Sequence, residues 1–285
     1  INPHIVELLP ADREATAADL KWLADPAEEP EPFGDGGTKM AWNTFNVVSI
    51  YPNGNPVMSD VNQRWVGDCC ACAVIASMAY LYPRFVKHII KDNMDKTYTV
   101  TMYDPKGKQI SVGVGGDYFI GNSGDLGALG GRNKEVTWAM IKWNQIYQGS
   151  SNVGGIGTEY VSAIFTGDGE SVGFGANALI AEDLQRAVEV SLKQGRLVIG
   201  GFTRSGEQVD QNWQTTSGHA FTFILPDDNT HLFKMRNPWG GTTDGVMKVK
   251  DDGRIPPMID LRICAPGAAK NYGVGPDLGG YIPNF

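Results

Sequence analysis

The segment from Cys69 to about Tyr82 constrains the fold of this chain more than any other. Its residues, CCACAVIASMAYLY, are apolar or small on nearly every side. A helix that is apolar all round is buried inside a protein rather than laid on its surface. Asp68 suits the position before such a helix, and Pro83 comes near its end. The sequence therefore predicts a buried helix that begins at Cys69.

The four cysteines are unevenly spaced along the chain. Cys69, Cys70 and Cys72 stand close together, whereas Cys264 lies far downstream. A disulfide scaffold spreads its cysteines, and a zinc site needs ligand pairs such as two CxxC spacings, which this sequence does not have. We interpret the cluster as one functional thiol with small buried neighbours.

Bulk composition excludes several classes of protein. The chain has 285 residues, 42% of them hydrophobic and 20% charged, which is typical of a globular protein. Its net charge of −8 argues against nucleic acid or an anionic membrane as the main partner and is compatible with binding divalent cations. No apolar run approaches the roughly 18 residues of a membrane span, and no signal peptide is visible at Ile1. Secreted, cell-surface and cytoplasmic locations all stay open.

The order of expected elements indicates an α+β fold. Residues 1–45 are expected to be an N-terminal extension, either a surface strap or the remnant of a pro-region, with a short helix in 11–25 and an acidic loop in 26–37. Residues 46–170 are expected to form a helical lobe that carries Cys69, and residues 171–285 a β-rich lobe. Gly-rich residues 149–175 are expected to be irregular and to mark the boundary. Other expected elements are a hairpin (96–114), an amphipathic helix (133–147), a helix (182–194) and strands (196–203, 219–225, 231–236, 245–249).

Four residues have the chemistry of a thiol nucleophile and its helpers. His219 follows Cys69 by 150 residues, Asn237 follows it by 168, and Gln63 precedes it by six. His and Asn about 130–150 residues after a reactive Cys is the papain spacing. A helix N-terminus and a nearby imidazolium both favour the thiolate form of a Cys. Asn237 would orient the imidazole, and the Gln63 amide with the Cys69 N–H would bind an oxyanion.

These motifs resemble the catalytic core of the calpain family, within the papain-like class. The family's Gln and Gly-Asp-Cys-Trp stand here as Gln63 and GDCC at 67–70, and its Gly-His-Ala and Arg-Asn-Pro-Trp-Gly as GHA at 218–220 and RNPWG at 236–240. The similarity covers roughly residues 60–250. It implies a papain-like two-lobed fold and a calcium-dependent cysteine endopeptidase, a bare protease core of microbial type. Cys70 departs from the family's Trp, and Arg64 from its Gly.

The resemblance also implies residue roles, partners and a metal. Cys69 would be the nucleophile, His219 the acid and base, Asn237 the orienting residue and Gln63 the oxyanion donor, with Trp239 shielding the His219–Asn237 bond. Protein or peptide substrates are implied, as is self-processing of the N-terminal segment. The family core binds Ca²⁺, which takes oxygen ligands. No EF-hand pattern is present, and the residues at the corresponding places are Asp68, Asp244, Asp251 and Asp252.

Two other functional classes fit the same residues. An acyl transferase of the transglutaminase type uses a Cys–His scaffold, although that class usually completes its triad with Asp rather than with a residue such as Asn237. An inactive relative that acts as a binding module is the third reading, although such chains usually lose the Cys or the His. The sequence favours the peptidase.

Overall fold

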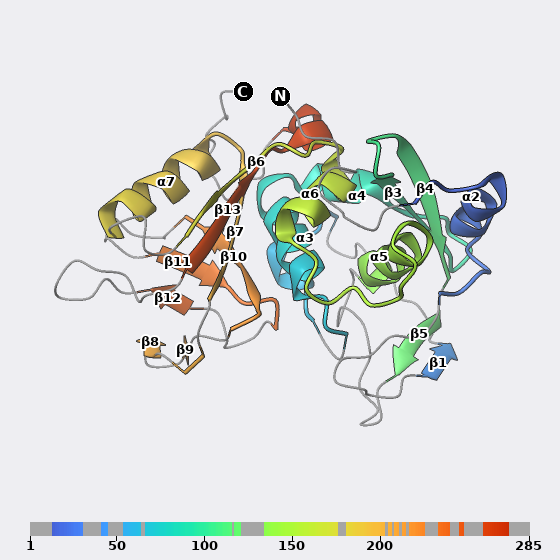
Figure 1. Ribbon diagram of the computed structural model, residues 1–285, viewed down its shortest axis with the longest axis horizontal. Coiled ribbons are helices and arrows are strands. Elements are labelled where there is room, and N and C mark those ends of the chain that lie inside the picture. The colour runs from blue at the N-terminus through green and yellow to red at the C-terminus, as the bar shows by residue number, and fades with distance from the viewer. Residues whose placement is uncertain are drawn as a thin grey trace.

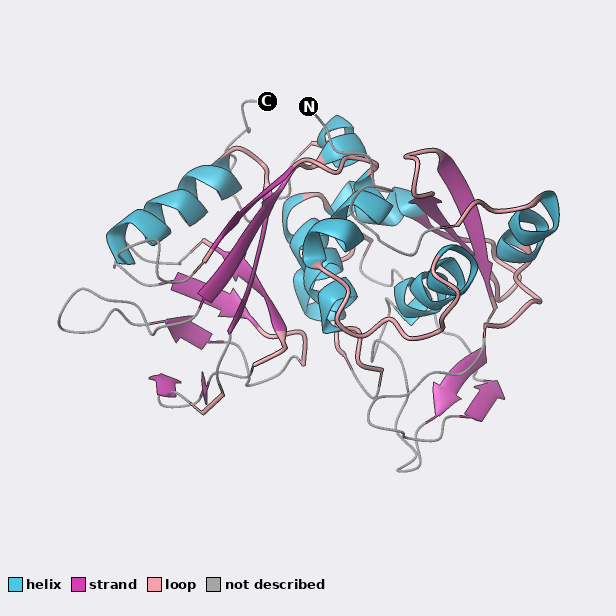
Figure 2. Cartoon of the chain, in the orientation of Figure 1, coloured by secondary structure: helices cyan, strands magenta, loops and turns pink. Residues whose placement is uncertain are grey.

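The computed structural model describes residues 13–30, 41–44, 54–63, 66–115, 117–120, 134–175, 181–202, 205–206, 208–210, 213–214, 217–225, 233–239, 245–247 and 259–273. The fold is α+β, as the sequence predicts. Helices and strands are largely segregated: the largest sheet lies with α7 (Ala181–Lys193) on one side of the molecule, and most other helices lie on the other (Figures 1 and 2).

The largest sheet has six strands, all antiparallel, in the order β12-β11-β10-β7-β13-β6. Its strands are β6 (Ser171–Phe174), β7 (Leu197–Phe202), β10 (Ala220–Ile224), β11 (Phe233–Arg236), β12 (Gly245–Met247) and β13 (Ile259–Cys264). Helix α7 packs against β7 and β10, and α3 (Cys69–Leu81) packs against the same two strands. Figure 1 shows the sheet between these two helices.

Helix α3 is the predicted buried helix. Every residue from Cys70 to Leu81 is buried, and only Cys69, at its first position, is partly exposed. Pro83 does more than end this helix, because it stands at the first turn of a second one, α4 (Pro83–Ile89). Proline is tolerated there since its missing N–H would have no intrahelical acceptor. Helices α5 (Lys134–Tyr147) and α6 (Thr158–Thr166) both pack against α3.

The predicted hairpin and the helix after it are confirmed. Strands β3 (Tyr98–Tyr103) and β4 (Gln109–Val114) pair in register from Tyr98–Val114 to Tyr103–Gln109, and β2 (Ile90–Asp92) extends them into a sheet. Helix α5 is less amphipathic than predicted, because all residues from 136 to 144 are buried. The Trp143 indole N–H donates to the Tyr103 carbonyl at 2.8 Å, which joins α5 to the hairpin.

The prediction that residues 149–175 are irregular is wrong. They contain α6 and β6, and α6 buries Val161, Ala163, Ile164 and Phe165. Gly167 ends α6 in the left-handed region at φ 74°, where glycine is favoured. Strand β13 was not predicted either, although it pairs with β7 on one side and β6 on the other. Short elements complete the description: β1 (Ala41–Thr44), β5 (Asp117–Ile120), β8 (Gln208–Asp210), β9 (Trp213–Gln214), η2 (Met58–Asp60) and η5 (Gly267–Tyr272).

Residues 13–30 are fastened to the helical side of the molecule. Helix α2 (Ala17–Ala24) starts with a capping box between Thr16 and Asp19. The buried Lys142 ammonium donates to the carbonyls of Asp25 (3.0 Å), Glu28 (2.9 Å) and Gly113 (2.9 Å). This segment therefore packs on α5 and β4 as part of the body.

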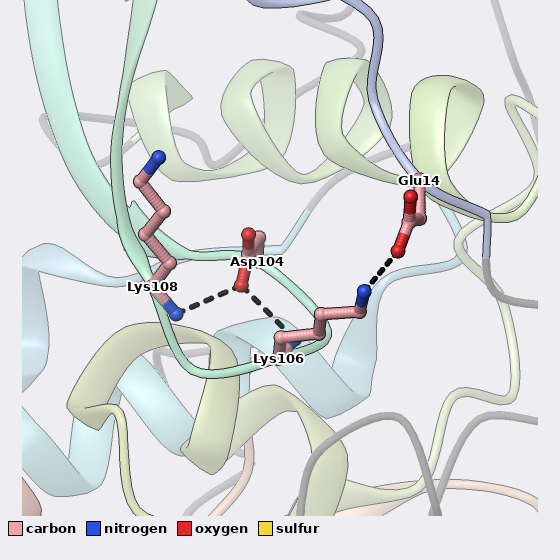
Figure 3. Close-up of polar contacts among 4 residues, drawn as sticks. All are labelled: Glu14, Asp104, Lys106 and Lys108. Carbon is pink, nitrogen blue, oxygen red and sulfur yellow. Dashed lines mark hydrogen bonds and ion pairs between the residues drawn. The ribbon is translucent and has the colours of Figure 1, made fainter.

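A second contact holds the same segment at the hairpin turn (Figure 3). Glu14 forms an ion pair with Lys106. The Asp104 carboxylate accepts the backbone N–H groups of Lys106 (2.9 Å) and Lys108 (2.8 Å), which fixes the turn that carries the lysine. Within the part of the chain described, no helix is both long and apolar enough to cross a membrane.

Candidate active site

The thiol of Cys69 is held at the start of α3. The first N–H groups of an α-helix have no intrahelical acceptor, and that of Cys69 is among them. Its Sγ lies 3.9 Å from the Gly218 carbonyl, although the two residues are 149 positions apart. Cys70 and Cys72 turn inward and are buried, which raises the pKa of both thiols well above the usual range. Cys69 is thus the partly exposed member of the cluster.

His219 and Asn237 are brought together by neighbouring strands. His219 directly precedes β10, Asn237 directly follows β11, and these strands pair antiparallel with Thr222 opposite Arg236. The His219 Nε2 and Asn237 Oδ1 atoms are 2.7 Å apart. Because the Trp239 N–H also donates to Oδ1, at 3.1 Å, that atom acts as an acceptor. Nε2 must then carry a hydrogen, which leaves Nδ1 to exchange a proton with another group.

The imidazole of His219 is enclosed by aromatic rings. Its exposed fraction is 8%. Trp239 lies tilted over it with ring centroids 4.5 Å apart, and Phe221 meets it edge-on at 4.9 Å. Burial lowers the pKa of His219, and the hydrogen bond to Asn237 partly opposes that shift. The predicted cover of the His219–Asn237 pair by Trp239 agrees with this packing, although the indole itself is 49% exposed.

Gln63 lies beside the Asn237 turn. Its backbone N–H donates to the Pro238 carbonyl at 2.7 Å. Its side-chain Nε2 donates to the Val66 carbonyl at 3.0 Å, and its buried Oε1 accepts no hydrogen bond from the described residues. The Arg236 guanidinium also reaches this loop and donates to the Val61 carbonyl at 2.5 Å. The loop before Cys69 is therefore joined to the residues that flank Asn237.

Asp68 is a buried carboxylate rather than an exposed one. Its exposed fraction is 1%, Thr137 of α5 donates to Oδ2 at 2.6 Å, and the Cys72 thiol donates to Oδ1 at 3.4 Å. Burial raises the pKa of Asp68 to about 6, and the Thr137 and Cys72 hydrogen bonds oppose that shift. Nothing in the spacing of the sequence marks Thr137 as the partner of Asp68.

Each oxygen of the Asp68 carboxylate accepts one hydrogen bond, from Cys72 and from Thr137. Asp244, Asp251 and Asp252 lie outside the described residues. Among the described residues, no cluster of three or more His, Cys, Asp or Glu is arranged to hold a metal ion. The calcium assignment stays a prediction.

Cys69 and His219 line one cleft of about 300 Å³. Its walls come from α3, from α6 and the loop before it, and from the strands β7, β10 and β13. The sequence did not point to three charged residues of this cleft, Glu159, Asp260 and Arg262. Glu159 lies in the first turn of α6, whereas Asp260 and Arg262 lie on β13, a strand that the sequence did not predict. The other lining residues are Cys70, Gly155, Ile156, Gly157, Thr158, Ile199, Gly200, Gly201, Phe202, Gly218 and Ala220.

No protein-family model matches this chain, and no curated protein matches it.

Proposed function

We propose that the protein is a calpain-like cysteine endopeptidase. One observation carries the proposal: the partly exposed Cys69 and His219 line the same cleft, although they are 150 residues apart in sequence, and Asn237 is hydrogen-bonded to that His219. A thiol, an imidazole and a group that orients the imidazole are the parts of a nucleophilic acyl-transfer site.

The proposed reaction begins with proton transfer from the Cys69 thiol to Nδ1 of His219, which leaves a thiolate and an imidazolium. The thiolate attacks the carbonyl carbon of a peptide bond and forms a tetrahedral oxyanion. The Cys69 N–H and the second N–H of the Gln63 amide, whose first N–H donates to Val66, are the proposed donors to that oxyanion. The intermediate collapses as His219 gives its proton to the leaving amine, and a thioester remains.

Hydrolysis of the thioester completes the cycle. His219 takes a proton from water, the resulting hydroxide attacks the thioester carbonyl, and the carbon–sulfur bond breaks to release the acid and restore the thiol. The role proposed for Asn237 is to hold the ring so that Nδ1 faces the sulfur. A low local dielectric strengthens that hydrogen bond, and the Trp239 ring packed over His219 keeps water away from it.

The proposal includes a papain-like arrangement, with Cys69 on a helical lobe and His219 and Asn237 on a β-rich lobe. The α+β fold and the cleft lined by both parts support it. Calcium would bind oxygen ligands and hold loops in place. Its proposed ligands are Asp68, Asp244, Asp251 and Asp252, and no step of the reaction is assigned to the ion.

Hydrolysis of casein and of a quenched fluorogenic peptide tests the proposal. The wild type, Cys69→Ala and Cys264→Ala are compared, because Cys264 is a buried thiol outside the cleft and serves as the matched control. Each is assayed with millimolar Ca²⁺ and with EDTA. We expect cleavage that Cys69→Ala abolishes and Cys264→Ala retains. Cleavage by the Cys69→Ala protein would refute the mechanism, and incorporation of an added amine in place of hydrolysis would favour the acyl transferase.

A further inference from the structure

A cluster of three charged side chains stands in the cleft that contains Cys69. Arg262, on β13, lies between two carboxylates: its Nε is 3.7 Å from Glu159 Oε2, and its Nη2 is 3.9 Å from Asp260 Oδ2. The exposed fractions of these side chains are 38% for Arg262, 17% for Glu159 and 48% for Asp260. The cluster is therefore open to the cleft and is partly shielded from bulk water at Glu159.

Two glycines leave room for two of the charged side chains. Gly173 of β6 pairs with Arg262 of β13, and a Cβ at Gly173 would lie 1.5 Å from Arg262 Nη1. The guanidinium thus crosses the neighbouring strand at a position that has no side chain. A Cβ at Gly157 would lie 2.9 Å from the Glu159 carboxyl group. The absence of a side chain at Gly173 and Gly157 leaves the space that the Arg262 guanidinium and the Glu159 carboxyl group occupy.

The rest of the cleft wall carries little charge. Apart from His219, its other lining residues are glycines, aliphatic residues, Phe202, Thr158 and the two cysteines. Two carboxylates against one guanidinium leave a surplus of one negative charge beside the thiol. The chain as a whole has a net charge of −8, which also attracts cations toward such a cleft.

We propose that Glu159, Asp260 and Arg262 form a specificity site that favours a Lys or Arg side chain of the peptide substrate, a proposal that rests on the peptidase function above. The substrate cation pairs with Glu159 and Asp260, and Arg262 competes with it for the same carboxylates. Arg262 thus weakens the preference that the two acids create. The glycine-rich walls leave backbone groups accessible for hydrogen bonds to an extended peptide. The charged cluster is therefore the part of the cleft that distinguishes between side chains of the substrate.

Matched fluorogenic peptides test this site. The set carries Lys, Gln or Glu in turn at each position on either side of the cleaved bond, and kcat/KM is measured for each peptide. At one of these positions we expect kcat/KM for the Lys peptide to exceed that for the Gln peptide by about fivefold. A factor of that size corresponds to the free energy of a well-placed, partly exposed charge pair. Glu159→Gln should bring this ratio close to one, and Asp260→Asn should lower it. Arg262→Met should raise the ratio, a change that loss of structure would not produce.

The control is Glu189→Gln, which removes an ion-paired carboxylate on α7 outside the cleft (2.5 Å from Lys193) and should leave the ratio unchanged. A wild-type preference for Glu at every position, or an unchanged ratio in both Glu159→Gln and Asp260→Asn, would overturn the proposal. The same labelled peptides are also titrated against the uncleaving Cys69→Ala protein by fluorescence anisotropy. If the wild type cleaves none of them, the peptidase function fails, while tighter binding of the Lys peptide would still support the charged site.

Discussion

The buried hydrogen bond from Thr137 to Asp68 predicts a large loss of stability when only the donor is removed. Thr137→Val keeps the shape and the burial of the side chain but deletes the hydroxyl that donates to Asp68 Oδ2 at 2.6 Å. Both residues are almost fully buried, so water cannot replace the lost donor. A hydrogen bond to a charged group contributes about 1.5–3 kcal/mol, and we expect the free energy of unfolding to fall by about that amount.

The matched control is Thr222→Val on β10. Thr222 is also buried, but its hydroxyl donates to the neutral backbone carbonyl of Ala73 at 2.7 Å. A hydrogen bond of that kind contributes about 0.5–1.5 kcal/mol. Urea unfolding followed by tryptophan fluorescence and circular dichroism measures both losses, and a shift in midpoint with an unchanged slope identifies a change in stability.

A double-mutant cycle with Asp68→Asn isolates the contribution of the pair itself. We expect the two substitutions together to cost less than the sum of the single losses, because each one breaks the same bond. A loss in Thr137→Val no larger than that in Thr222→Val would refute the reasoning. It would mean that Asp68 is stabilised by other contacts and that α3 does not depend on this link to α5.

Three further predictions follow from the described contacts. Asn237→Ala should lower kcat by at least about tenfold with little change in KM, because it frees the His219 ring and leaves the residues that line the cleft unchanged. Steady-state kinetics measures both constants, and a rise in KM instead would mean that Asn237 binds substrate. Trp239→Ala should lower kcat/KM but cost only about 1 kcal/mol or less in urea unfolding, because the indole is half exposed; an unchanged kcat/KM would contradict the shielding role. Burial lowers the pKa of Lys142 to about 8. Because the unfolded chain then binds more protons than the folded one above that pH, the Lys142 contribution to stability should rise as the pH goes from about 8 to about 10.5. Denaturation of wild type and Lys142→Met at several pH values measures this, and a constant difference would contradict it.

Local patterns predicted the elements that depend on local physics. Helix α3 follows from its unbroken apolar run, the β3–β4 hairpin from its alternation and turn, and the end of α7 from Gly195, which has a φ of 74°. The contact between Cys69 and Gly218 could be predicted only from the papain-like spacing, because no local pattern links residues that are 149 positions apart.

Features that depend on long-range pairing could not be predicted in this way. Helix α6 is short and stands between glycines, which resemble loop residues when read along the sequence. Strand β13 gains its place from pairing with β7 and β6 rather than from its own composition. The charged cluster around Arg262 depends on its register with Gly173, and that register is visible only in the folded chain.

Titration of activity against a thiol reagent tests the central claim most directly. The protein is treated with iodoacetamide in steps from substoichiometric to excess, residual peptide hydrolysis is measured at each step, and the four cysteines are mapped by mass spectrometry. The proposed mechanism predicts that activity falls in proportion to modification of Cys69, while the buried thiols Cys70, Cys72 and Cys264 stay unmodified. Full hydrolysis after complete modification of Cys69 would contradict it.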